Sequence, residues 1–120
     1  MKDLAPDIFR QRLLIEGFFS GEMSRDRLRV FLLQLAAALD LRAYGEPVIF
    51  QPASDMGKEE NAGFDAFVPL IDSGISAYVW TGPRFFSLLL YTCKGFDAHA
   101  AVAHARSMLG VESEIASHSF

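Results

Sequence analysis

The stretch GFDAFVPLIDSGISAYVWTGPRFFSLLLYTC, residues 63–93, decides the fold of this 120-residue chain. It contains three runs of strand-forming residues, at 63–71, 73–81 and 84–93. An Asp-Ser-Gly turn separates the first two runs, and a Gly-Pro turn separates the last two. Because such short turns connect antiparallel neighbours, the stretch predicts a meander of three antiparallel strands.

Two helices are expected on either side of this meander. Ser24 is a suitable N-cap for the first helix, which is expected to end near Asp40. Asp97 can cap the second helix, and Gly110 stands just past its end. The apolar residues of both recur at spacings of three and four: Leu28, Phe31, Leu32, Leu35 and Leu39 in the first, and Val102, Ala105, Met108 and Leu109 in the second.

The other segments complete the order of elements. Residues 9–19 and 48–50 predict strands, and residues 111–115 predict a last, weak strand. Residues 53–62 hold the densest polar cluster and are expected to form an exposed loop. The order strand, helix, four strands, helix, strand predicts a single α+β domain over residues 1–120. It is a two-layer sandwich, in which one antiparallel sheet carries both helices on one face.

Composition suggests that this sheet has a partner. Hydrophobic residues make up 51% of the chain and charged residues only 22%, which is apolar for a soluble chain of this length. The sheet face without helices is left for solvent or a second subunit, and the apolar surplus leads us to expect a homodimer. The net charge is −4 and the basic residues are scattered, so nucleic-acid binding is not expected.

Other classes of protein can be set aside on local sequence. The longest nearly uncharged stretch, 66–83, contains an aspartate and prolines, so we expect no membrane-spanning helix. The N-terminal residues show no apolar signal region, which favours the cytoplasm. The lone Cys93 excludes an internal disulfide and a cysteine-rich zinc site. His99 and His104 are five residues apart and do not share a helix face, so no metal site is expected.

Residues 72–93, DSGISAYVWTGPRFFSLLLYTC, place a serine after an acid at a strand junction and the only cysteine at the end of the following strand. This stretch resembles the prokaryotic S-adenosylmethionine decarboxylases, a pyruvoyl-dependent family. Their core reads Glu-Ser-His-Ile-Ser-Ile-His-Thr-Trp-Pro-Glu, followed by a strand ending Phe-Thr-Cys-Gly. Ser73 falls on the pyruvoyl-forming serine and Cys93 on the catalytic cysteine. Family residue types are also kept at Ile75, Ser76, Trp80 and Thr92.

The resemblance extends over nearly the whole chain. The run RLLIEGFF, residues 12–19, is similar to the family's His-Leu-Leu-Leu-Asp strand, and Phe50-Gln51-Pro52 is similar to its Phe-x-Pro. The resemblance implies an S-adenosylmethionine decarboxylase-like sandwich, with residues 53–62 as an insertion. Phe50 falls on an aromatic residue that stacks on adenine. Phe50 and Trp80 are therefore the candidate ligand-binding residues, for a small molecule of adenosyl or amino-acid type.

The resemblance also implies a chemistry. The hydroxyl of Ser73 would attack the carbonyl of Asp72, and the chain would cut itself into residues 1–72 and 73–120. A pyruvoyl group derived from Ser73 would then serve as an electron sink for the loss of carbon dioxide, in place of pyridoxal phosphate. Cys93 would reprotonate the product carbon. In the family this reaction belongs to polyamine (spermidine) biosynthesis.

The chain departs from the family at the residues that support this chemistry. The processing histidine is replaced by Tyr78, whose phenol is a poor base at neutral pH, and the helper serine by Asp65. Gly74 replaces the histidine that follows the pyruvoyl serine. The ribose-binding glutamate is missing from residues 81–84. Asp65 or Asp72 could substitute for the lost base.

Two functions therefore stay open. The first is a diverged pyruvoyl decarboxylase that acts on S-adenosylmethionine or another amino acid. The second is a non-catalytic relative that keeps the fold without self-cleavage and binds a ligand or regulates a partner. Residue types alone would make Ser73 an ordinary hairpin serine, Cys93 a buried thiol and Phe50 a core residue. An offset of five would also place Ser73 and Tyr78 on opposite faces of one flat strand.

Overall fold

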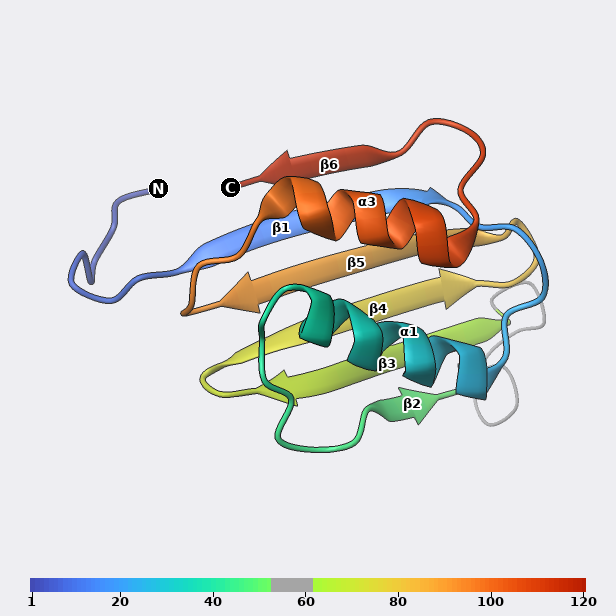
Figure 1. Ribbon diagram of the computed structural model, residues 1–120, viewed down its shortest axis with the longest axis horizontal. Coiled ribbons are helices and arrows are strands. Elements are labelled where there is room, and N and C mark those ends of the chain that lie inside the picture. Colours follow the sequence, from blue (N-terminus) through green and yellow to red (C-terminus); the bar gives the residue numbers. More distant parts are fainter. Residues whose placement is uncertain (53–61) are drawn as a thin grey trace.

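The computed structural model describes residues 1–52 and 62–120, so most of the polar loop expected at 53–62 lies outside the described residues. The elements are β1 (Gln11–Phe18), α1 (Arg25–Ala38), β2 (Val48–Phe50), β3 (Gly63–Leu70), β4 (Ser73–Trp80), β5 (Phe85–Thr92), α3 (Ala98–Leu109) and β6 (Ala116–Ser119). Within the described residues, this order is the predicted one (Figure 1).

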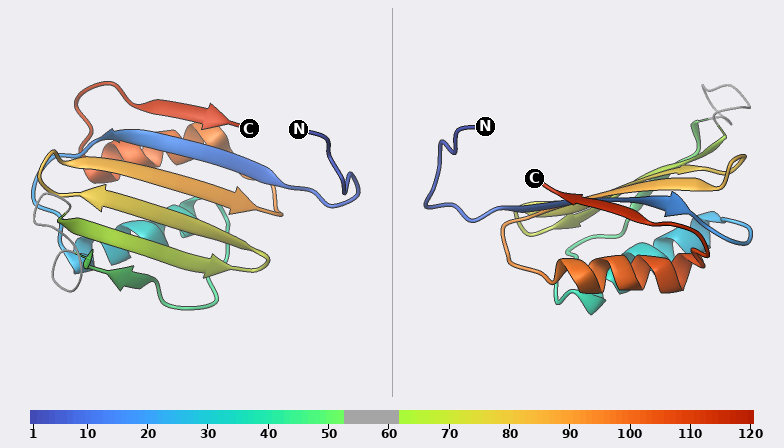
Figure 2. Two further views of the ribbon diagram at one scale, coloured as in Figure 1. Left: turned by 180° about the vertical axis from the view of Figure 1, so that it is seen from behind. Right: turned by 90° about the horizontal axis from the view of Figure 1, so that it is seen from above.

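The strands form one six-stranded sheet in the order β2-β3-β4-β5-β1-β6, and every pair in it is antiparallel. The predicted meander forms its centre as β3, β4 and β5. Both helices lie on the same face of the sheet, as the view from above in Figure 2 shows. The predicted two-layer α+β sandwich is therefore confirmed.

Side chains of the central strands alternate between the helix layer and the other face of the sheet. In β4, Ile75, Ala77 and Val79 are buried under the helices, whereas Ser76 and Tyr78 point the other way. We call the helix-free side the open face. Its large apolar side chains are Leu14, Phe18, Val48, Phe50, Phe67, Tyr78, Trp80, Phe85, Leu89 and Tyr91.

Both helices begin where their caps predict. The Ser24 hydroxyl accepts a hydrogen bond from the Arg27 backbone N–H at 3.0 Å. The Asp97 carboxylate accepts from the N–H groups of His99 and Ala100. Gly110 ends α3 in the left-handed conformation, with φ at 62°. All five apolar residues predicted for the first helix are buried.

Two of the four residues predicted for the apolar face of the second helix, Ala105 and Leu109, are fully buried. Ala101, Ala105 and Leu109 are the buried residues of α3, while Val102 and Met108 are only half-buried. Ala101 and Ala105 belong to the hydrophobic core, and α3 lies beside α1 (Figure 1). The larger side chains pack along the edges of that contact.

The strand predicted at 111–115 is wrong, because the last strand is β6 at Ala116–Ser119. Val111 is buried, and the Arg106 guanidinium donates hydrogen bonds to the carbonyls of Val111 and Ser113. The segment is thus tied to the end of α3. Pairing with β1 begins only at Ala116, which lies opposite Glu16.

His104 lies in the contact between the two helices. Its ring stacks on Phe31 of α1, with 6.1 Å between the ring centroids. Its Nε2 atom is buried without a hydrogen-bond partner among the described residues. Burial lowers the pKa of the His104 ring below its ordinary value of 6.5. None of the described helices is both long and apolar enough to span a membrane.

Substitutions at two glycines, Gly63 and Gly82, test how closely β3 and β4 approach each other. A Cβ atom at Gly63 would lie 1.7 Å from the carbonyl oxygen of Val79, whereas at Gly82 it would meet nothing within 4 Å. We expect Gly63→Ala to lower the free energy of unfolding by about 3 kcal/mol or more, because backbone must move. Gly82→Ala should stay within about 0.5 kcal/mol of the wild type. Urea denaturation measures both, and equal effects would contradict the assigned register.

The pH dependence of stability tests the burial of His104. As the pH falls through 6.5, the unfolded chain takes up a proton on this ring and the folded chain does not, so stability is lost. We expect a lower melting temperature at pH 5.5 than at pH 7.5, and a smaller difference in His104→Gln. The exposed His99 of the same helix supplies the control His99→Gln, which should keep the wild-type difference. An unchanged difference in His104→Gln would contradict the burial.

Candidate functional site

Ser73 and Cys93, which are twenty residues apart in the sequence, lie in contact. Ser73 is the first residue of β4, and Cys93 directly follows β5. The Ser73 hydroxyl oxygen accepts a hydrogen bond from the Cys93 backbone N–H at 2.9 Å. The Cys93 Sγ lies 3.5 Å from that oxygen and 3.5 Å from the carbonyl of Ile71. The structure therefore brings the predicted pair together.

The bond that self-cleavage would break lies at the end of a tight turn. Ile71 and Asp72 form the turn between β3 and β4, which pair from Leu70 opposite Ser73. Asp72 has φ at 51°, in the left-handed region. Aspartate tolerates this conformation better than most residues, at a modest cost in energy. The Asp72–Ser73 peptide is exposed on one side, because Asp72 is an exposed residue.

Ser73 also lines a cavity of about 480 Å³ beside the C-terminal end of α1. Its lining residues are Ala37, Asp40, Leu41, Arg42, Leu70, Ile71, Ser73 and Lys94. The Lys94 ammonium donates hydrogen bonds to the backbone carbonyl and the carboxylate of Asp40, at 2.7 and 3.0 Å. A cation is favourable at a helix C-terminus. The sequence analysis missed both residues, although Lys94 directly follows Cys93.

Asp65 and Tyr78 stand where the decarboxylase family has its helper serine and its processing histidine. They form a second cluster, on the open face. Asp65 lies directly opposite Tyr78 across β3 and β4, and Phe50 of β2 lies opposite Asp65. Together with Ser76, these three residues line a shallow cavity of about 440 Å³. Phe50 is 62% exposed, so it is not a core residue.

The two clusters are separate within one protomer. Ser73 is two residues before the buried Ile75, so it lies on the helix side of β4, whereas Tyr78 projects from the open face. Five residues of strand also span about 17 Å. Tyr78 and Asp65 of one protomer therefore do not reach its own Ser73, and Asp72 is the only one of these candidate groups beside it in the chain.

Trp80 does not join Phe50 at a common site. The Trp80 ring packs against Phe85 with 5.5 Å between centroids, and Phe85 packs against Phe18. The cavity that Phe50 lines does not include Trp80. The structure thus places the two candidate ligand-binding residues in different parts of the open face.

Contacts in the structure explain why position 74, directly after Ser73, is a glycine. A Cβ atom at Gly74 would lie 2.3 Å from the ring of Phe67 on the neighbouring strand. Phe67 lies over this position and is itself 43% exposed. The space that a histidine would need in the decarboxylase motif is therefore taken by an aromatic ring.

Comparisons with known proteins support the fold. No protein-family model and no curated protein matches the chain. Among solved structures, the adenosylmethionine decarboxylase from Aquifex aeolicus VF5 is similar, with a TM-score of 0.72 and 15% sequence identity. The match covers 94% of this chain and 89% of that one. The protein therefore has an S-adenosylmethionine decarboxylase-like fold, and at this identity the likeness extends to the fold alone.

Proposed function

We propose that this protein is a pyruvoyl-dependent decarboxylase that forms its catalytic group from Ser73. The observation that carries this proposal is the contact between Ser73 and Cys93, with 3.5 Å between hydroxyl oxygen and thiol sulfur. A serine precursor and a proton donor must act on the same small molecule, so they must lie side by side. The antiparallel register of β4 and β5, in which Gly74 lies opposite Tyr91, brings the two residues together.

Self-cleavage begins with the chain's own residues. The Ser73 hydroxyl attacks the carbonyl carbon of Asp72, and an ester replaces the peptide bond. Elimination then releases the Asp72 carboxylate, and uptake of water with loss of ammonia leaves a ketone at position 73. The backbone N–H of Cys93, 2.9 Å from the hydroxyl oxygen, orients it.

The surroundings of Ser73 fit such a group. Ser73 is half-buried and lines a cavity whose walls combine the apolar Ala37, Leu41, Leu70 and Ile71 with charged residues at the rim. The pyruvoyl group supplies an electron sink for a substrate that carries an amine and a carboxylate. The Cys93 thiol stands within reach of the same position and donates a proton to the product carbon. Lys94 and Asp40 hold the rim of the cavity against α1.

The proposal includes a homodimer through the open face. Six large side chains on this face are between 42% and 62% exposed: Phe18, Val48, Phe50, Phe67, Tyr78 and Tyr91. An isolated soluble protomer rarely exposes so many together. Asp65 and Tyr78 lie on this face, so a second copy packed on it would cover both residues.

We propose a small amine with a carboxylate as the substrate, either S-adenosylmethionine or another amino acid. The substrate must reach position 73, so it enters the cavity that Ser73 lines, whose other polar lining residues are Asp40, Arg42 and Lys94. The turn at Thr81–Arg84 has no carboxylate to bind ribose hydroxyls. This favours an amino acid without a nucleoside. A working Cys93 must stay reduced, so we place the protein in the cytoplasm.

A second candidate function is a non-catalytic relative that binds a ligand or regulates a partner while its chain stays whole. One observation favours it: Tyr78 and Asp65 lie on the open face and not beside Ser73. In this case the pyruvoyl group does not form and no cofactor is needed. The fold and the homodimer are the same under both functions.

Intact mass separates the two functions. We expect the purified wild type to give two fragments, residues 1–72 and 73–120, and Ser73→Ala to stay at the full mass because it has no hydroxyl to attack Asp72. The matched control Ser107→Ala, at an exposed position of α3, should cleave as the wild type does. A wild-type chain that stays whole on long incubation would exclude the decarboxylase and support the non-catalytic relative.

The role of the Cys93 thiol as a proton donor is tested in protein that has already cleaved. Cys93→Ala should still cleave, and its release of labelled carbon dioxide or of the correctly protonated amine should fall by about 100-fold or more, as for loss of a general acid. Substrates to compare are S-adenosylmethionine and a set of free amino acids, each labelled in the carboxylate. Unchanged turnover in a cleaved Cys93→Ala protein would remove the thiol from the mechanism.

Light scattering tests the dimer. We expect the wild type to be a dimer across the micromolar range and Leu89→Glu to be a monomer, because a buried charge on the open face would be desolvated without a partner. Ala103→Glu adds the same charge at an exposed position on the helix layer and should stay dimeric. A monomeric wild type, or a dimeric Leu89→Glu, would contradict the proposed interface.

A further inference from the structure

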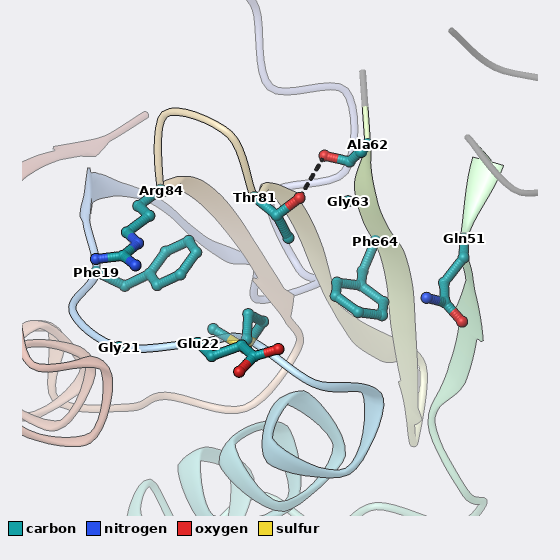
Figure 3. Close-up of a pocket in the computed structure, with 10 residues that line it drawn as sticks. Phe19, Gly21, Glu22, Gln51, Ala62, Gly63, Phe64, Thr81 and Arg84 are labelled. Atoms are coloured by element: carbon teal, nitrogen blue, oxygen red, sulfur yellow. Dashed lines mark hydrogen bonds between the residues drawn. The ribbon is translucent and has the colours of Figure 1, made fainter. Parts of the chain in front are cut away.

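A third cavity lies at the opposite end of the sheet from Ser73 and has no part in the proposed decarboxylase. It has a volume of about 310 Å³ and lies where β1, β2 and β4 end and β3 begins (Figure 3). Its lining residues are Phe19, Gly21, Glu22, Met23, Gln51, Ala62, Gly63, Phe64, Thr81 and Arg84. Ser73 and Trp80 stand at the two ends of β4, so about 23 Å of strand separates the two sites.

The floor of this cavity is apolar and rigid. Phe19, Met23 and Phe64 form it, and each is no more than 6% exposed. At Gly63 the backbone itself is the wall, since a Cβ atom there would meet the Val79 carbonyl at 1.7 Å. Gly21 has φ at 80°, which bends the chain away from β1. The cavity is therefore held by packed side chains and backbone, which is typical of preformed small-molecule sites.

The side-chain amide of Gln51 is held in place over this apolar floor. Arg25 of α1 donates hydrogen bonds to the side-chain oxygen of Gln51, at 2.9 Å, and to the backbone carbonyl of Ile49. Because the Gln51 oxygen is taken, its amide N–H₂ is left as a donor, and Figure 3 shows it on the side of the cavity. The Thr81 hydroxyl is already used, since it donates to the Ala62 carbonyl at 3.1 Å.

Two opposite charges complete the lining. Glu22 and Arg84 both border the cavity. In the described part of the chain, neither the Glu22 carboxylate nor the Arg84 guanidinium makes a hydrogen bond or an ion pair. In the view of Figure 3, Arg84 and Gln51 stand at opposite ends, with Glu22 and the Phe64 ring between them. A cationic and an anionic group of one ligand would thus find separate partners.

We propose that this cavity binds a free α-amino acid with an apolar side chain. Glu22 accepts hydrogen bonds from the ammonium group, and Arg84 binds the carboxylate in the two-pronged geometry that a guanidinium offers. The side chain rests on Phe19, Met23 and Phe64. A volume of about 310 Å³ is at the small end for ligand sites and suits a molecule of this size. The site is independent of self-cleavage, so it stands or falls apart from the proposed function.

Thermal shift and calorimetry on the full chain test the proposal, with L-leucine and L-phenylalanine as probes. At ten times the dissociation constant, a ligand of the folded state should raise the melting temperature by about 3 to 6 °C. Two analogues of leucine separate its charges: 4-methylpentanoate lacks the ammonium group, and 3-methylbutylamine lacks the carboxylate. Each analogue should bind at least about tenfold more weakly than leucine.

Substitutions of Glu22 and Arg84 test which group of the amino acid each side chain binds. Glu22→Gln and Arg84→Met should each weaken leucine binding about tenfold or more. Glu22→Gln should also leave binding of 4-methylpentanoate unchanged, since that ligand has no ammonium group. Glu112→Gln, at an exposed position elsewhere, is the matched control for Glu22→Gln. Arg42→Met, in the cavity beside Ser73, tests whether leucine binds there instead, and both variants should bind leucine as the wild type does.

Four outcomes would overturn the proposal. These are no shift with either amino acid, leucine binding that survives both Glu22→Gln and Arg84→Met, loss of binding in Arg42→Met, and loss of binding in Ser73→Ala. The last two would place the amino acid in the cavity beside Ser73. A chain that never cleaves but binds leucine through Glu22 and Arg84 would refute the decarboxylase and keep this site.

Discussion

The structure depends on one geometric constraint, the alternation of side chains along antiparallel strands in a sheet that has helices on only one face. In β4 this alternation buries Ile75, Ala77 and Val79 beneath α1 and α3, and it leaves Ser76 and Tyr78 on the open face. A slip of one residue would exchange the two sets and expose the core. The position of every candidate functional residue on the central strands follows from this register.

The same constraint separates the chemistry into two places. Groups that could cut the chain or protonate a product, Ser73 and Cys93, meet where β4 begins and β5 ends. Groups that could serve as bases, Asp65 and Tyr78, are paired in the middle of the open face. No change of side-chain rotamer joins the two clusters, because the strand between them is fixed. Asp72, the remaining candidate base, directly precedes Ser73 in the turn.

Local patterns were sufficient to predict the sandwich, and tertiary contacts account for what they missed. Helix caps at Ser24 and Asp97 and the alternation in β4 depend on neighbouring residues, so the sequence shows them. The pairing of β6 with β1 joins the two ends of the chain, and its short polar sequence carries no strand pattern. Likewise, the bond from Lys94 to Asp40 spans 54 positions, and the fit of the Phe67 ring over Gly74 depends on strand register.

The position of Asp72–Ser73 in the fold would make the proposed self-cleavage compatible with stability. A cut within a strand would break a ladder of hydrogen bonds, but this bond lies in the turn between β3 and β4. Residues 1–72 supply β1, α1, β2 and β3, and residues 73–120 supply the rest. Three of the five strand pairings, β3 with β4, β1 with β5 and β1 with β6, therefore join one fragment to the other. Both fragments also contribute to the same core, so a cleaved chain would remain one folded body, with its new end beside Cys93.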